Sequence, residues 1–89
     1  MSNATNPSTT RYTVFGHQQC GFCRRAKLLL EERELPFRYV DIHVEGISKA
    51  DLSKTVGREV TTVPQVFYGQ QYVGGFEALE KHIEEALRA

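Results

Sequence analysis

Two short runs of β-forming residues enclose a helical segment in the first half of this chain. Residues 11–16 and 37–42 carry aromatic and β-branched side chains, whereas residues 20–34 are mostly strong helix formers. A strand–helix–strand unit of this kind pairs its strands in parallel through a right-handed crossover. We therefore predict an α/β fold that is built on a parallel strand pair.

The second half adds a helix, a hairpin and a final helix. A helix is expected to begin at Ser48, with Asp51 as an imperfect capping box, and to end at Gly57. Short strands at 65–68 and 71–73 are joined by a hairpin turn and must be antiparallel. An amphipathic helix follows at 76–87. The order β-α-β-α-β-β-α predicts a mixed four-stranded sheet that is flanked by three helices on both faces.

The composition indicates one small globular domain. Of the 89 residues, we expect 1–10 to form a disordered polar leader and 11–89 to form the domain. Eleven basic residues balance eleven acidic ones, so the charge does not point to nucleic acid or a membrane surface. No apolar run approaches the roughly 20 residues of a membrane span, and no secretory signal is present. A cytoplasmic protein is expected, and there a cysteine pair is more often catalytic or metal-binding than structural.

The two cysteines of the chain, Cys20 and Cys23, lie within the segment CGFC at the start of the first predicted helix. A helix start presents unpaired N–H groups and the positive end of the helix dipole, both of which favour a thiolate. Cys20 is expected at the N-cap and Cys23 one turn further on, in a more enclosed place. We therefore predict that Cys20 attacks a disulfide and that Cys23 resolves the mixed disulfide.

Positive charge surrounds this segment. Arg24, Arg25 and Lys27 follow it, and no acidic residue occurs between positions 17 and 30. These cations are expected to lower the pKa of the Cys20 thiol and to attract anionic thiol compounds.

Three other interpretations of the cysteines stay open at this point. They could be small core residues, or a static disulfide, although such a bond would close almost no loop in a reducing compartment. They could also be half of a zinc site together with His17. Structural zinc usually takes four ligands, and His43 and His82 lie far away in the sequence.

Two further motifs lie in the second half. Pro64 precedes a predicted strand, where it either opens the strand or holds a cis bond that exposes the backbone of Val63 to a peptide-like thiol. Gly74 and Gly75 either form a plain turn or leave backbone N–H groups open to an anion at the start of the last helix.

In order and spacing, the segments 20–23 (CGFC), 62–67 (TVPQVF) and 74–75 (GG) resemble the glutaredoxin family over about residues 11–87. The stretch 39–42 (YVDI) resembles the short bacterial dithiol members. The resemblance implies a thioredoxin fold and a glutathione-dependent thiol–disulfide oxidoreductase, with Cys20 as nucleophile and Cys23 as resolving thiol. It also implies a set of glutathione-binding residues: Phe22, Thr62, Val63, Pro64 in the cis form, Gly75, Phe76 and Glu77.

The sequence departs from the usual family pattern at three places. Gly21-Phe22 replaces Pro-Tyr between the cysteines, and Ala78 stands where a second acidic residue is common. His17 stands where relatives often carry Lys, and its charge depends on pH near neutrality. We expect a reduced affinity for glutathione, with His17, Arg24 and Lys27 tuning the thiol.

The resemblance leaves two alternative functions. The pair Gly21-Phe22 resembles the motif of the monothiol relatives, which bind a [2Fe–2S] cluster between two subunits. In this chain, such a cluster would be held by Cys20 and glutathione. A thioredoxin-like electron donor is the other alternative. No metal ion is otherwise expected. The implied partners are glutathione and disulfide-bearing or glutathionylated proteins, with ribonucleotide reductase as one candidate, and the protein is expected to be a monomer.

Overall fold

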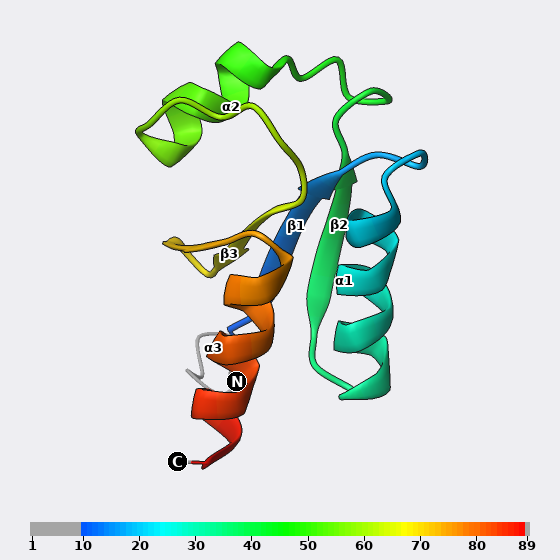
Figure 1. Ribbon diagram of the computed structural model, residues 1–89, viewed down its shortest axis with the longest axis vertical. Coiled ribbons are helices and arrows are strands. Elements are labelled where there is room, and N and C mark those ends of the chain that lie inside the picture. Colours follow the sequence, from blue (N-terminus) through cyan, green and yellow to red (C-terminus); the bar gives the residue numbers. More distant parts are fainter. Residues whose placement is uncertain (1–9, 89) are drawn as a thin grey trace, which may run out of the picture.

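Seven elements follow one another in the predicted order in the computed structural model, which describes residues 10–88 (Figure 1). They are β1 (Tyr12–Gly16), α1 (Gly21–Glu32), β2 (Phe37–Asp41), α2 (Lys49–Val56), β3 (Gln65–Tyr68), β4 (Gln71–Gly74) and α3 (Phe76–Arg88). Of the predicted leader, residues 1–9 lie outside the described part of the chain.

The four strands form one mixed sheet in the order β2-β1-β3-β4. β1 and β2 run parallel, from Tyr12 opposite Phe37 to Gly16 opposite Asp41, and α1 makes the crossover between them. β3 is antiparallel to both β1 and β4, as the hairpin turn requires. The predicted mixed sheet with three helices is confirmed.

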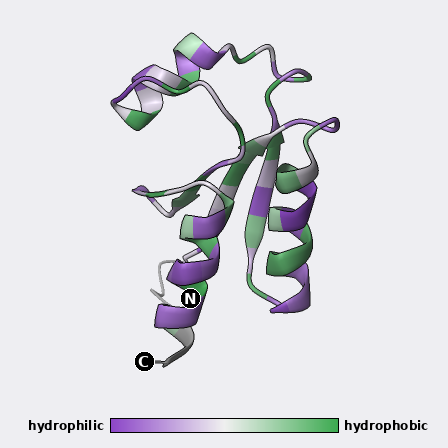
Figure 2. Cartoon of the chain, viewed as in Figure 1, coloured by the Kyte–Doolittle hydropathy of each residue, from purple (hydrophilic) through white to green (hydrophobic). Residues whose placement is uncertain are grey.

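The side chains of β1 alternate between two hydrophobic clusters, one on each face of the sheet. Tyr12 and Val14 belong to the main cluster, which also holds Leu30 of α1 and Leu79 of α3. Phe15 packs against the second cluster, which is built around Leu52 and two other buried residues. A fully buried leucine stabilises a fold by roughly 1.5–3 kcal/mol. The face of α3 that is seen in Figure 2 carries mainly hydrophilic residues.

The helix α2 is fixed by its ends more than by its core. Leu52 is its one buried residue, whereas α1 buries three. The capping box is complete, because the Asp51 N–H donates to Ser48 Oγ and the Ser48 N–H donates to Asp51 Oδ2, both at 3.0 Å. Hydrogen bonds to the Asp51 carboxylate from the Ser48 N–H and then from the Ser48 side chain lower the pKa of Asp51. Gly57 ends the helix in the left-handed conformation, with φ 89°.

Several element ends differ from the sequence prediction by one or two residues, and two of these differences have a clear structural reason. α1 ends at Glu32 and not at residue 34, because Glu34 has a left-handed backbone with φ 56° that cannot continue the helix. β4 extends one residue further than predicted, because Gly74 still pairs with Val66. None of the helices within residues 10–88 has the length and apolar character needed to cross a membrane.

Candidate active site

Cys20 caps the N-terminus of α1 with its own sulfur atom. Its backbone is extended, and Sγ accepts a hydrogen bond from the N–H of Cys23 at 3.1 Å. This bond satisfies one of the N–H groups that a helix start leaves open. The Cys20 thiol also donates to the carbonyl oxygen of Val63 at 3.5 Å, so the partly buried sulfur touches the segment before β3.

Cys23 lies one turn further along α1 and is fully buried. Burial raises the pKa of its thiol to about 12, and a hydrogen bond with Cys20 acts in the same direction. Both cysteines are free thiols. The predicted difference in enclosure is therefore present, with Cys23 inside and Cys20 nearer the surface.

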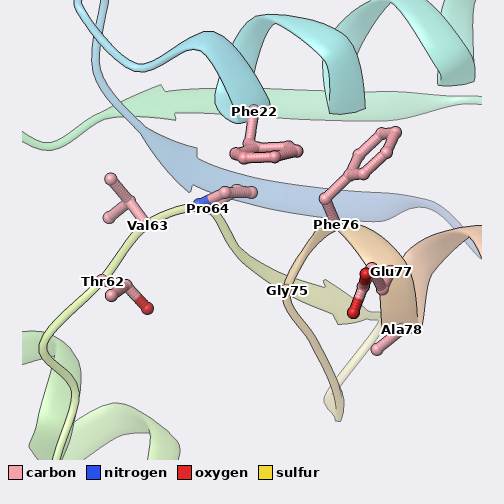
Figure 3. A pocket seen from close by; sticks show the side chains of 8 residues that line it. All are labelled: Phe22, Thr62, Val63, Pro64, Gly75, Phe76, Glu77 and Ala78. Atoms are coloured by element: carbon pink, nitrogen blue, oxygen red, sulfur yellow. The ribbon is translucent and has the colours of Figure 1, made fainter.

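A pocket of about 570 Å³ lies beside Cys20 (Figure 3). Val63, which accepts the hydrogen bond from the Cys20 thiol, is one of the residues that line it. The lining comes from the start of α1, the segment before β3 and the start of α3. It consists of Phe22, Thr62, Val63, Pro64, Gly75, Phe76, Glu77 and Ala78. The structure thus brings together all seven residues that the sequence indicated for glutathione binding, and Ala78 is the one addition.

The backbone around this pocket is shaped at two points. The Val63–Pro64 peptide bond is cis, as the resemblance implied, and Pro64 is buried at the start of β3. The two glycines have different roles. Gly74 has φ 128°, and a Cβ there would lie 2.8 Å from the Cβ of Ala78, whereas a Cβ on Gly75 would meet only ordinary contacts. Gly74 is needed for the fold, and Gly75 lines the pocket.

Two aromatic rings form the side of the pocket toward α1, and one cation lies against them. The rings of Phe22 and Phe76 lie 5.7 Å apart, and the Arg25 guanidinium lies 5.5 Å and 5.7 Å from their centroids. Phe22 is 53 % exposed, which leaves its ring open to a ligand. Arg25 is thus the cation of this segment that lies against the rings of the pocket.

The other groups predicted to tune the thiol point elsewhere. Arg24 and Lys27 line a second groove of about 640 Å³, whose remaining lining is Gln18, Tyr39, Asp41, Val44 and Glu45. His17 stacks on His43 with ring centroids 4.6 Å apart and planes 7° from parallel, and its buried Nδ1 has no hydrogen-bond partner within the described residues. Their effect on the thiol stays a prediction.

The zinc alternative finds no support in the geometry. Among residues 10–88, no three His, Cys, Asp or Glu side chains are grouped in a way that could hold a metal ion. His17 is instead stacked on His43, and Cys23 is enclosed in the core.

Sequence reasoning missed two neighbours of Cys23. A Cβ on Gly16, at the end of β1, would lie 2.6 Å from Cys23 Sγ and 2.7 Å from the Tyr39 hydroxyl. The same hydroxyl donates to the carbonyl oxygen of His17 at 3.2 Å. A glycine at the end of a strand often marks such a close approach, and that signal was available in the sequence.

Comparison with known proteins identifies the family of this chain. The family model described as Glutaredoxin matches residues 12–73. Glutaredoxin 1 of Salmonella typhimurium is 49 % identical over 79 residues, covering 83 % of this chain and 91 % of the relative.

Two solved structures show the same arrangement of elements. The structure of reduced Escherichia coli glutaredoxin has a TM-score of 0.78 at 39 % identity and covers 89 % of this chain and 99 % of that one. A buckwheat glutaredoxin–glutathione complex has a TM-score of 0.70 at 28 % identity, with 91 % and 76 % covered.

These neighbours have the thioredoxin fold, which confirms the predicted fold class. The chain belongs to the glutaredoxin family of thiol–disulfide oxidoreductases.

Proposed function

We propose that this protein reduces protein disulfides and glutathione mixed disulfides and is itself reduced by glutathione. Cys20 is the nucleophile and Cys23 the resolving thiol. The observation that carries the proposal is the pocket beside Cys20, because its lining joins a partly exposed sulfur to the backbone at Val63 and to the first turn of α3.

The pocket suits a small acidic peptide with a thiol. Its volume of about 570 Å³ lies in the range of ligand sites, roughly 300–1,000 Å³. The backbone of Val63, which precedes the cis bond to Pro64, can pair with the cysteine of glutathione as an added strand would. Open N–H groups at the start of α3, together with the charge of Arg25, favour a carboxylate. The buckwheat relative was solved as a complex with glutathione.

The chemistry follows from these positions. The Cys20 thiolate attacks a protein–glutathione disulfide at the glutathione sulfur, and the protein sulfur leaves and takes up a proton. The glutathione moiety bound to Cys20 then lies in the pocket. A second glutathione attacks its sulfur, releases oxidised glutathione and restores Cys20. For a protein disulfide, Cys23 instead attacks Cys20 and releases the substrate thiol.

Two cysteine variants test the assignment in a glutathione-coupled assay with the cysteine–glutathione mixed disulfide. Cys20→Ser is expected to abolish turnover, because it removes the attacking sulfur. Cys23→Ser is expected to keep this activity but to lose most of the reduction of a protein disulfide. Retained turnover by Cys20→Ser would overturn the proposal.

The choice of reductant separates this function from that of a thioredoxin-like electron donor. The oxidised protein is expected to be reduced quickly by glutathione and slowly by thioredoxin reductase with NADPH. The opposite preference would favour the electron-donor alternative. A reduction potential of roughly −200 to −230 mV is expected for the class.

The remaining expectations stay predictions. A cytoplasmic location, a monomeric state and ribonucleotide reductase as a partner follow from the sequence and the resemblance only. The [2Fe–2S] alternative needs a second subunit, and anaerobic reconstitution with glutathione tests it through the visible spectrum: cluster absorbance that depends on Cys20 would establish it.

A further inference from the structure

Tyr39 places a hydroxyl group next to the buried sulfur of Cys23. The absent Cβ of Gly16 leaves a space whose nearest atoms are Cys23 Sγ and the Tyr39 oxygen, at 2.6 Å and 2.7 Å from the Cβ position. A hydrogen bond between these two side chains also contributes to the pKa of each group, so the two atoms lie close together. Tyr39 comes from β2 and Cys23 from α1, so the parallel strand pair and the crossover helix bring them together at the end of β1.

The hydroxyl of Tyr39 has two possible acceptors. It now donates to the carbonyl oxygen of His17 at 3.2 Å. A tyrosine hydroxyl carries one proton, which turns about the C–O bond and can be donated in either of two directions. The second direction leads to Cys23 Sγ once that sulfur is a thiolate and becomes a strong acceptor.

Burial, together with neighbouring acidic groups, keeps Tyr39 protonated. Burial, the neighbouring Cys23 and Asp41 raise its pKa to about 12. From α1, the Lys27 ammonium lies 5.7 Å from the centroid of the ring and helps to hold it in place. Tyr39 therefore acts near neutral pH as a fixed donor and not as a base.

We propose that Tyr39 is a positioning residue for the resolving step: its hydroxyl orients the Cys23 sulfur and donates a hydrogen bond to the Cys23 thiolate as it forms. The inference rests on the proposed roles of the two cysteines.

The step balances as follows. Cys23 gives its proton to water and attacks Cys20 Sγ in the mixed disulfide. The Cys20–Cys23 bond forms, and the bond between Cys20 and the substrate sulfur breaks. The substrate leaves as a thiolate and takes up a proton, and the two cysteines have supplied its two electrons. Without Tyr39, the thiolate would form in the buried site with less hydrogen bonding.

Rapid mixing of the reduced protein with 5,5′-dithiobis(2-nitrobenzoate) separates the two attacks. Each attack releases one coloured thiolate, first through Cys20 and then through Cys23. Tyr39→Phe is expected to leave the first phase unchanged and to slow the second by about tenfold or more, the loss expected for one hydrogen bond to a charged group. The rate of the second phase is also expected to reach its plateau at a higher pH.

Three controls make the result decisive. Tyr72→Phe removes a hydroxyl that bonds Gln65 in the β3–β4 hairpin and should leave both phases unchanged. Cys23→Ser should keep only the first phase, with the same rate whether residue 39 is Tyr or Phe. An unchanged second phase in Tyr39→Phe overturns the inference. Loss of the first phase in Cys23→Ser would instead overturn the cysteine roles of the proposed function.

Discussion

Cys20 and Cys23 lie one helical turn apart, but their sulfur atoms have opposite surroundings. Cys20 Sγ lies at a helix end, contacts backbone groups of Cys23 and Val63, and adjoins a pocket that is open to solvent. Cys23 Sγ is fully buried beside Gly16 and Tyr39. The thiol of Cys20 is thus accessible to a substrate, whereas the thiol of Cys23 is shielded from it.

The difference shows how one motif can separate two reactions in time. A thiol whose pKa is raised to about 12 carries little thiolate near neutral pH, so Cys23 stays inert while Cys20 exchanges with substrates. Cys23 reacts only when a mixed disulfide forms next to it and supplies a high effective concentration. The four predictions below test this separation.

The largest expected effect is a difference in alkylation. With limiting iodoacetamide near pH 7.5, Cys20 should be labelled at least about a hundredfold faster than Cys23, because a buried thiol of raised pKa offers almost no thiolate. Mass spectrometry of the proteolytic peptides measures the ratio. In the unfolded protein both cysteines should react alike, and equal labelling in the native protein would contradict the comparison.

A methyl group at Gly16 should disturb the inner sulfur. In Gly16→Ala the new Cβ would lie 2.6 Å from Cys23 Sγ, so the free energy of unfolding should fall by about 1–3 kcal/mol. Denaturant unfolding of the reduced protein measures this loss.

Gly21→Ala is the matched control for that substitution, because nothing lies within 4 Å of its Cβ position. It should leave stability unchanged or raise it by about 0.4–1 kcal/mol through helix propensity. Equal losses in the two variants would argue against the close packing at Gly16.

Alkaline pH should destabilise the reduced protein through the same buried sulfur. The native state keeps the Cys23 proton until about pH 12, whereas an unfolded thiol loses it near pH 8.5. The unfolded state therefore binds fewer protons in this window, and the free energy of unfolding falls as pH rises. Tyr39, whose pKa is also raised to about 12, adds to the fall above about pH 10.

Denaturant unfolding between pH 8 and 11 measures the slope of this loss. Cys23→Ala removes the titrating thiol, so its stability should decline less steeply with pH than that of the unchanged protein. Parallel slopes for the two proteins would contradict the raised pKa of Cys23.

The smallest expected effect concerns the pocket beside Cys20. Arg25→Gln removes the cation that lies against Phe22 and Phe76. The KM for glutathione should rise about two- to fivefold, because the variant loses one surface charge that attracts the carboxylates of the ligand. Arg33→Gln, at the far end of α1, is the matched control and should not change KM. Equal KM values in both variants would show that Arg25 does not contribute to glutathione binding.

The surroundings of Cys20 and its pocket could be predicted from sequence, because they are built from short continuous segments of the chain. CGFC, the segment before β3 and the glycines before α3 are each read as a short motif, and backbone conformation decides their roles. The order of elements then brings the three motifs to one end of the sheet, and together they line the pocket.

The surroundings of Cys23 could not be predicted in the same way, because they depend on contacts between different helices and strands. The position of Tyr39 beside Cys23 follows from the parallel pairing of β1 with β2 and from the packing of α1. The sequence of β2, FRYVD, does not alternate strictly between apolar and polar residues, so it does not tell which face Tyr39 occupies. The separation of Arg25 from Arg24 and Lys27 likewise depends on side-chain directions around α1.

The side-chain hydroxyl of Ser53 on α2 accepts the N–H of Val60 at 2.8 Å. This bond ties the segment that leads to Thr62 and Val63 to the helix with the fewest buried residues. Local opening of α2 should therefore cost less free energy than global unfolding, and it would release one wall of the pocket while both cysteines stay in place. A ligand in the pocket would consequently slow amide hydrogen exchange in α2, a helix that does not line it.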